Sequence, residues 1–179
     1  MSLRLTNSLS RQKEDFKPVL PGHVGLYVCG PTVYGDPHLG HAKTYISFDV
    51  IVRYLRFCGY TVTYIQNITD VGHLVGDEDD GDDKVQQKAR EINRQPMAIV
   101  EHYTCRHFAM MDRLQVKRPD ISPRATGHIP EQLQLIETLL AQGKAYERNG
   151  SIYFDVSQDS EYGILSGRKG EDMLSGTRV

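Results

Sequence analysis

The hydrophobic pattern of the first third of the chain predicts a strand, a helix and a second strand. The short apolar run Val24–Cys29 stops at a Gly-Pro pair and suits a buried parallel strand. The next apolar stretch, His41–Phe57, is too long for a strand and is apolar on most sides, which indicates a largely buried helix ended by Gly59. The β-branched and aromatic run Tyr60–Ile65 predicts a second strand. This order is a βαβ motif, the repeating element of a doubly wound α/β sheet.

The middle of the chain is helical by periodicity up to a proline-rich segment. Apolar positions at helical spacing predict two helices, the first buried through Val85, Ala89 and Ile92 and the second through Val100, His107, Met111 and Leu114. Before them, the acidic, glycine-punctuated segment Val75–Lys84 is expected to be a solvated loop. After them, three prolines in Lys117–Pro130 disfavour a helix and mark a candidate domain boundary.

A helix and a hairpin are predicted beyond this boundary. Pro130 suits the first turn of a helix that Gly143 ends. The expected apolar face of that helix consists of Leu133, Ile136 and Leu140. Asn149–Gly150 then stands between two alternating segments, which is a strong signal for a two-residue hairpin turn.

Composition narrows the class of protein. With 179 residues, 39% hydrophobic and 25% charged, the chain suits one globular domain, or one domain with a small appendage. A net charge of −2 gives no basic face for nucleic acid. The three cysteines, Cys29, Cys58 and Cys105, are far apart and odd in number, which favours a reducing compartment over a disulfide scaffold. No apolar run approaches the ~18 residues of a membrane span, so we expect a cytoplasmic protein.

The glycine-rich turn between the first strand and the helix is the candidate chemical site. Doubly wound sheets bind nucleotides at this position, where unpaired N–H groups and the helix dipole favour an anion. His38 and His41, three residues apart, would face the same way and supply donors, and Gly40 would leave room for a base or ribose. Neither a dinucleotide fingerprint nor a P-loop is present. The histidines could instead cap the helix or, with Cys29, hold a metal ion.

Three sequence motifs resemble the cysteinyl-tRNA synthetase family. They are Tyr-Val-Cys-Gly, His-Leu-Gly-His and Asn-Ile-Thr-Asp, all within residues 27–70. The likeness continues in "NSLSRQKEDFKP", "RPDISPRATGHI" and "YGILSGR", so it covers nearly the whole chain. His-Leu-Gly-His by itself would indicate only a class I synthetase or a related nucleotidyltransferase.

This resemblance implies a Rossmann-like catalytic domain that activates L-cysteine with ATP and transfers it to tRNA(Cys) in protein synthesis. It implies that His38, Gly40 and His41 bind ATP, the two histidines being catalytic. It implies that Cys29 is one ligand of a zinc ion that also takes the substrate sulfur. It further implies an amino-acid pocket lined by Gly30, Thr32 and Thr69. From the residues alone, core packing is the favoured interpretation of Cys29, and a buried strand-end threonine is that of Thr69.

The second ATP signature of the family, Lys-Met-Ser-Lys-Ser, does not occur in this sequence. We therefore expect an N-terminal fragment, with residues 1–118 as the first half of the catalytic domain and 119–179 as part of a connective insertion. Such a fragment should be inactive alone, bind ATP weakly, hold no tight zinc and self-associate through exposed sheet surface. The complete enzyme is expected to be a monomer.

Two alternatives remain at this point. One is a cysteine ligase that transfers the activated amino acid to an amino-sugar rather than to tRNA. The other is a stand-alone, non-catalytic module that binds a nucleotide or a protein partner. The acceptor used by the complete protein separates the first alternative from the synthetase.

Overall fold

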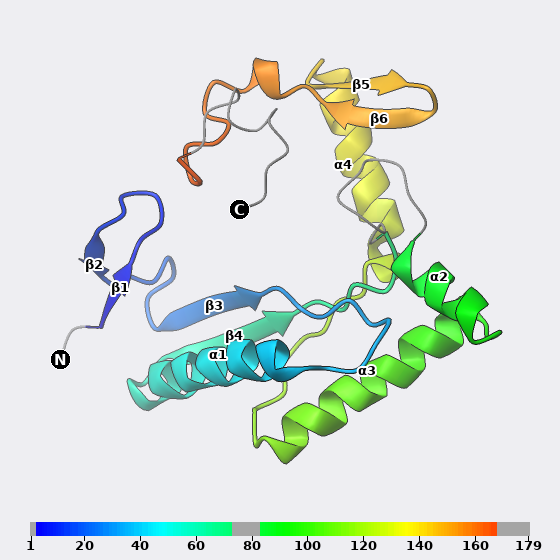
Figure 1. Ribbon diagram of the computed structural model, residues 1–179. Coiled ribbons are helices and arrows are strands. Elements are labelled where there is room, and N and C mark those ends of the chain that lie inside the picture. Colours follow the sequence, from blue (N-terminus) through cyan, green and yellow to red (C-terminus); the bar gives the residue numbers. More distant parts are fainter. Residues whose placement is uncertain (1–2, 73–82, 168–179) are drawn as a thin grey trace. The chain divides into compact units, whose positions relative to one another are not determined.

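The computed structural model describes residues 3–72 and 83–167 (Figure 1). The chain forms two compact units. Unit 1 comprises Met1–Lys17 and Pro130–Val179, and unit 2 comprises Pro18–Ile129. Of the acidic segment Val75–Lys84, only the last two residues lie among those described. The predicted division between residues 118 and 119 concerns a catalytic half and an insertion, and it stays a prediction.

The centre of unit 2 is the expected βαβ motif. Strands β3 (His23–Val28) and β4 (Thr61–Gln66) pair in parallel, and helix α1 (Leu39–Phe57) connects them (Figure 1). In the proline-rich segment that follows the helices, residues 117–125 form no helix, as the composition predicts, and they continue the sheet, whereas residues 126–130 are helical. Gln66 N–H donates to the Ile121 carbonyl at 3.0 Å, in parallel pairing beside β4.

Helix α1 is buried on one face only. Its buried side chains, Tyr45, Asp49, Val52 and Leu55, are three or four residues apart and form one stripe. Val50 and Phe57 are apolar but 60% and 85% exposed. The expectation of a helix buried on most sides is therefore wrong for this structure. Strand β3 likewise alternates between exposed and buried positions, because one face of the two-stranded sheet lies open in the described residues.

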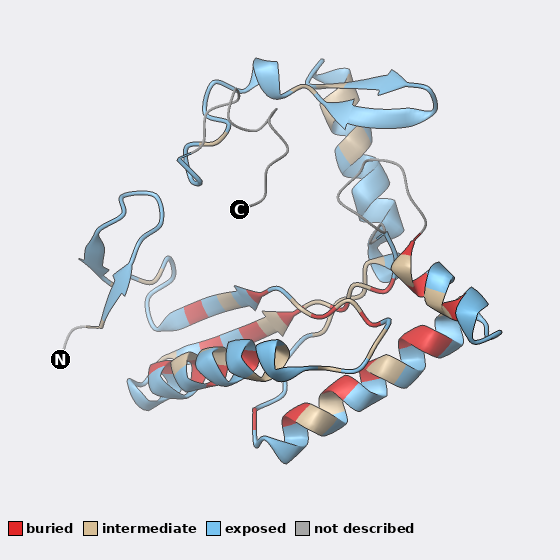
Figure 2. Cartoon of the chain, in the orientation of Figure 1, coloured by how far each residue is buried: buried red, intermediate tan, exposed pale blue. Residues whose placement is uncertain are grey.

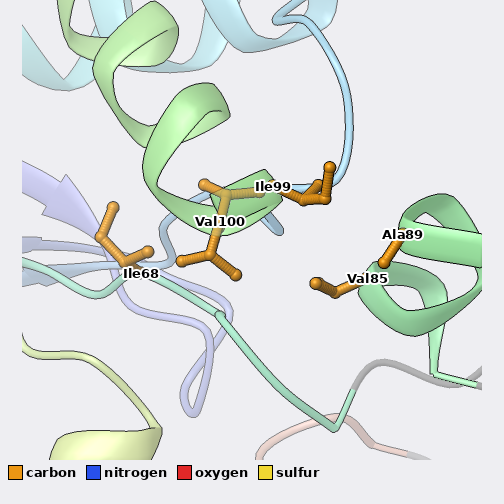
Figure 3. Close-up of a cluster of buried hydrophobic side chains, with 6 residues drawn as sticks. Ile68, Val85, Ala89, Ile99 and Val100 are labelled. Carbon is orange, nitrogen blue, oxygen red and sulfur yellow. The ribbon is translucent and has the colours of Figure 1, made fainter. Parts of the chain in front are cut away.

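The hydrophobic core of unit 2 lies where helices α2 (Lys84–Glu91) and α3 (Pro96–Arg113) meet the loops that follow the strands. Its buried cluster consists of Val33, Ile68, Val85, Ala89, Ile99 and Val100 (Figure 3). Most of the predicted helical faces are confirmed, since His107 and Met111 are buried as well. Ile92 and Leu114 are exceptions, because they are the C-caps of the two helices and lie exposed.

The main elements among the described residues of unit 1 are two hairpins and a helix. Strands β1 (Arg4–Thr6) and β2 (Lys13–Asp15) form an antiparallel hairpin that the sequence pattern did not predict. Helix α4 (Ile129–Ala141) leads to strands β5 (Ala145–Arg148) and β6 (Ser151–Phe154).

The β5–β6 hairpin confirms its sequence signal. Asn149 and Gly150 connect the two strands with φ of 53° and 78°, as a two-residue hairpin turn requires. The described residues also form two short 3₁₀ helices, η1 (Thr126–His128) in unit 2 and η2 (Val156–Gln158) in unit 1. No described residue of unit 1 is buried (Figure 2). None of the described helices combines the length and the apolar character that crossing a membrane would need.

Candidate functional site

The two histidines of His-Leu-Gly-His begin helix α1 and cap it reciprocally. His38 is the N-cap residue with an extended backbone, and its Nδ1 accepts from the Gly40 N–H at 3.1 Å. The N–H of His38 in turn donates to His41 Nδ1 at 3.1 Å, and the two ring centroids lie 4.0 Å apart. This arrangement is a capping box built from histidines, which satisfies two otherwise unpaired backbone donors. The helix-cap alternative is therefore realised in the fold.

The capping bonds fix where the ring protons lie. Because each Nδ1 accepts from a backbone N–H, the proton of a neutral ring must be on Nε2. Burial, and then the proximity of His38, lower the pKa of His41. His41 is therefore neutral at pH 7, with its Nε2–H free of the capping bonds. Capping and donation to a ligand thus use different atoms of the same rings.

Gly40 is required by the cap itself. A Cβ at this position would lie 2.8 Å from His38 Cε1 and 3.0 Å from His38 Nδ1, closer than carbon atoms normally approach. The space that the missing side chain leaves is thus taken by the His38 ring. A base or ribose could use that space only if this ring moved.

A small pocket of about 170 Å³ connects the histidines to the turn after β3. Its lining residues are Thr32, Tyr34, Gly35, Asp36, His38 and His41. Charged side chains surround this pocket. Arg106 Nη2 donates to Asp36 Oδ2 at 3.0 Å, and the Lys84 ammonium lies 5.6 Å from the centroid of the Tyr34 ring. The structure therefore brings Thr32 together with both histidines, beside two cationic side chains.

The remaining predicted pocket residues, Gly30 and Thr69, lie in the segments that directly follow β3 and β4. Thr32 and Thr69 form an isolated parallel bridge, with Val33 N–H donating to the Thr69 carbonyl at 3.3 Å. Gly30 lies so tightly against the segment that follows β4 that a Cβ would be 1.5 Å from the backbone oxygen of Asn67. Only glycine fits at position 30 without a backbone shift.

Asn67 joins the predicted pocket residues, although the sequence analysis gave it no role. Its Oδ1 accepts from the Gly30 N–H at 2.8 Å and from the Tyr27 hydroxyl at 2.9 Å. Its Nδ2 donates to Thr69 Oγ1 at 3.0 Å. The available signal was its place at the start of Asn-Ile-Thr-Asp, two residues before Thr69.

Cys29 follows β3 with an exposed side chain, so its thiol is accessible as a soft metal ligand. Its carbonyl accepts from the Tyr45 hydroxyl at 3.3 Å, and the Tyr45 ring stacks against His41 with centroids 6.3 Å apart. Tyr45 thus contacts both the strand end and the helix start. Within residues 3–72 and 83–167, no three His, Cys, Asp or Glu side chains gather in a way that could hold a metal. Cys29 therefore fits a zinc site only as one donor.

His107 is a second group that sequence reasoning placed merely in the core. It is 2% exposed, and neither ring nitrogen has a hydrogen-bond partner within the described parts of the chain. Its ring meets Tyr45 edge-on at 5.2 Å. Burial, and then the proximity of His41, lower the pKa of His107 to about 4. His107 therefore lies neutral behind the ring that stacks on His41.

Comparison with known proteins places these features in a family. Residues 15–179 match the family model described as tRNA synthetases class I (C) catalytic domain. The chain is 56% identical to a cysteine–tRNA ligase of Chlorobaculum tepidum, over 99% of this chain and 38% of that protein. It is 53% identical to a cysteine–tRNA ligase of Thermus thermophilus, over 100% of this chain and 37% of that protein. The chain thus spans well under half the length of these curated relatives.

Solved structures agree on the fold. The Mycobacterium tuberculosis methionyl-tRNA synthetase in complex with methionyl-adenylate is 24% identical over 69% of this chain and 22% of its own, with a TM-score of 0.56. A second structure of that enzyme, bound by methionyl-adenylate, covers 78% of this chain and 29% of its own at 20% identity, with a TM-score of 0.55. The Rossmann-like α/β class expected from the sequence is confirmed. The chain belongs to the family of class I tRNA synthetase catalytic domains of the cysteine type.

Proposed function

We propose that this chain is the part of a cysteine–tRNA ligase that binds ATP and the amino acid and forms cysteinyl-adenylate. The observation that carries the proposal is the histidine pair at the start of α1. Both Nδ1 atoms are engaged in capping the helix, and both rings line one pocket beside Thr32. Their Nε2–H groups remain as donors at a helix N-terminus, which suits a phosphate.

The proposed reaction, formation of cysteinyl-adenylate followed by transfer to tRNA(Cys), uses these donors in its first step. The carboxylate of L-cysteine attacks the α-phosphorus of ATP in line, the bond to the bridging oxygen breaks, and pyrophosphate leaves. Donors from His38 and His41 stabilise the negative charge that develops on the α-phosphate oxygens. The terminal adenosine hydroxyl of tRNA(Cys) then attacks the adenylate carbonyl and releases AMP. We assign the contacts with the tRNA to parts of the complete protein that correspond to the regions of the relatives not covered by this chain.

The other predicted residues have supporting roles in this proposal. Gly30, Thr32 and Thr69 line the amino-acid pocket, and Gly40 admits the adenosine once the His38 ring moves aside. Cys29 would supply one thiolate ligand to a zinc ion, with the other ligands from outside the described residues. Such an ion would bind the substrate thiol and select against a hydroxyl, which is a poorer soft ligand. The three free cysteines support a cytoplasmic location, and the complete enzyme is proposed to be a monomer.

Pyrophosphate exchange in the full-length protein that carries this chain tests the role of the histidines. His41→Ala should lower cysteine-dependent exchange about 10²–10³-fold, the usual effect of losing one donor to transition-state charge. His38→Asn should lower it as well while the helix stays capped, because asparagine is a favourable N-cap residue. His102→Ala, at an exposed position on α3, is the matched control and should leave exchange unchanged.

Unaltered exchange in His41→Ala would refute the assignment of the catalytic pair. An acceptor assay completes the test. Aminoacylation of tRNA supports the proposal, whereas ligation of cysteine to an amino-sugar without tRNA would support the alternative enzyme.

A further inference from the structure

Asn67 has one unambiguous side-chain orientation. A backbone N–H can only donate a hydrogen bond, so the atom of Asn67 that lies 2.8 Å from the Gly30 nitrogen must be the amide oxygen. The amide NH₂ group then necessarily faces Thr69, whose Oγ1 lies 3.0 Å from Nδ2. The usual ambiguity between the oxygen and nitrogen of an asparagine does not arise here.

This orientation determines what the Thr69 hydroxyl can do. Since Asn67 Nδ2 has no lone pair to offer, the Thr69 oxygen is the acceptor and its own proton is directed elsewhere. Across residues 3–72 and 83–167, no hydrogen bond donated by this hydroxyl is found. The backbone of Thr69 is already engaged, because its N–H donates to the Pro31 carbonyl at 3.0 Å and its carbonyl accepts from Val33. The hydroxyl proton is the one polar group of Thr69 left for a ligand.

We propose that Asn67 is a positioning residue of the amino-acid pocket, which holds the Thr69 hydroxyl as a hydrogen-bond donor toward the substrate. A fixed donor selects the carboxylate or the thiolate of the amino acid, which accept, and disfavours its ammonium group, which only donates. Asn67 acts through Thr69 and through the Gly30 backbone, and it does not itself take part in the reaction. This inference rests on the proposed function, in which Gly30 and Thr69 line that pocket.

The test replaces Asn67 by the isosteric aspartate. In Asn67→Asp the carboxylate still accepts from the Gly30 N–H and the Tyr27 hydroxyl, but it cannot donate to Thr69. The Thr69 hydroxyl turns round and donates to the carboxylate, so its proton is lost to the substrate. In cysteine-dependent pyrophosphate exchange by the full-length protein, we expect the KM for cysteine to rise about tenfold. The KM for ATP should stay within about twofold.

A double-mutant cycle with Thr69→Val separates positioning from general loosening. Thr69→Val removes the hydroxyl at nearly constant volume and should raise the KM for cysteine to a similar extent. Adding Asn67→Asp to Thr69→Val should then have no further effect, because the group through which Asn67 acts is gone. Thr69→Ser keeps the hydroxyl and should retain most of the affinity for cysteine.

Tyr27→Phe is the matched control. It removes the other side-chain hydrogen bond of Asn67 and leaves the bond to Thr69 in place. Because Tyr27 is largely exposed, this variant should fold normally and keep the wild-type KM for cysteine.

The outcomes are distinct. An unchanged KM for cysteine in Asn67→Asp, effects that multiply in the double variant, or an equal loss in Tyr27→Phe would each overturn the inference. If Asn67→Asp does not fold, Asn67→Ala enters the same cycle under the same criteria. A wild-type protein that exchanges pyrophosphate only with another amino acid would refute the cysteine assignment instead, and the cycle would then be read with that amino acid.

Discussion

Unit 2 and unit 1 place similar apolar side chains in opposite surroundings. Ile99, on helix α3 of unit 2, is 1% exposed and packs in the cluster of Figure 3. Leu135, on helix α4 of unit 1, is 61% exposed. Every buried side chain that the structure describes belongs to unit 2 (Figure 2). Both helices were predicted from the same kind of apolar periodicity, so the periodicity alone did not distinguish them.

The difference shows what converts a periodic apolar stripe into a core. In unit 2, helices α2 and α3 present their stripes to each other and to the loops after two parallel strands. The candidate site lies on these same loops, so the packing that buries Val33 also places Thr32. In unit 1, the hairpins and α4 bury no described side chain, and their order depends on local hydrogen bonds and turns. The comparison predicts that mutations in the two units have very different effects on stability.

The largest expected effect comes from the core of unit 2. Ile99→Ala should lower the free energy of unfolding by about 2–5 kcal/mol, because it removes buried methyl groups and leaves a cavity. Leu135→Ala, a similar truncation on α4, should change the stability by less than about 0.5 kcal/mol, as is usual for surface sites. Urea unfolding followed by circular dichroism measures both. Comparable losses of unfolding free energy in the two variants would contradict the conclusion that only unit 2 has a buried apolar core among the described residues.

A smaller effect is expected where backbones meet beside the site. Gly30→Ala should destabilise unit 2 by about 1–3 kcal/mol or more, because its methyl group would overlap the Asn67 backbone oxygen. Gly25→Ala is the matched control, since a Cβ at this position of β3, the strand that precedes Gly30, meets nothing within 4 Å. Thermal unfolding of the two variants gives the comparison. Equal stabilities would show that the backbones separate at little cost.

Because His107 is buried, we expect the stability of unit 2 to depend on pH. Its pKa of about 4 in the folded state lies below its ordinary value of about 6.5, so the unfolded chain binds the proton more readily. The stability is fully present above about pH 6.5 and falls as the pH drops toward 4, with a loss of about 2 kcal/mol at pH 5. His107→Phe should flatten the stability curve between pH 6.5 and 4. A wild-type curve that is already flat there would show that the ring is not buried in its neutral form.

The local elements were largely predictable from the sequence. The prediction of the Asn149–Gly150 turn is confirmed because both residues tolerate positive φ. The prediction of α3 is confirmed because its apolar residues recur at helical spacing. The β1–β2 hairpin was missed, because its strands are three residues long, fully exposed and polar in pattern. Helix α1 was predicted in the right place but with too much burial. Its sequence shows which side chains are apolar, but it does not show which of them pack against another element.

The candidate site divides in the same way. The sequence by itself determined the residue types and their order: two histidines around a glycine after an apolar strand, and a threonine after the next strand. Only the tertiary structure decided how they act together. Asn67 is distant from Gly30 in the chain, yet its side chain accepts a hydrogen bond from the Gly30 N–H. Thr69 likewise pairs with Thr32 across the parallel strands. Tyr45 contacts both Cys29 and His41. Such contacts depend on strand pairing and on packing between distant segments, which no local pattern encodes.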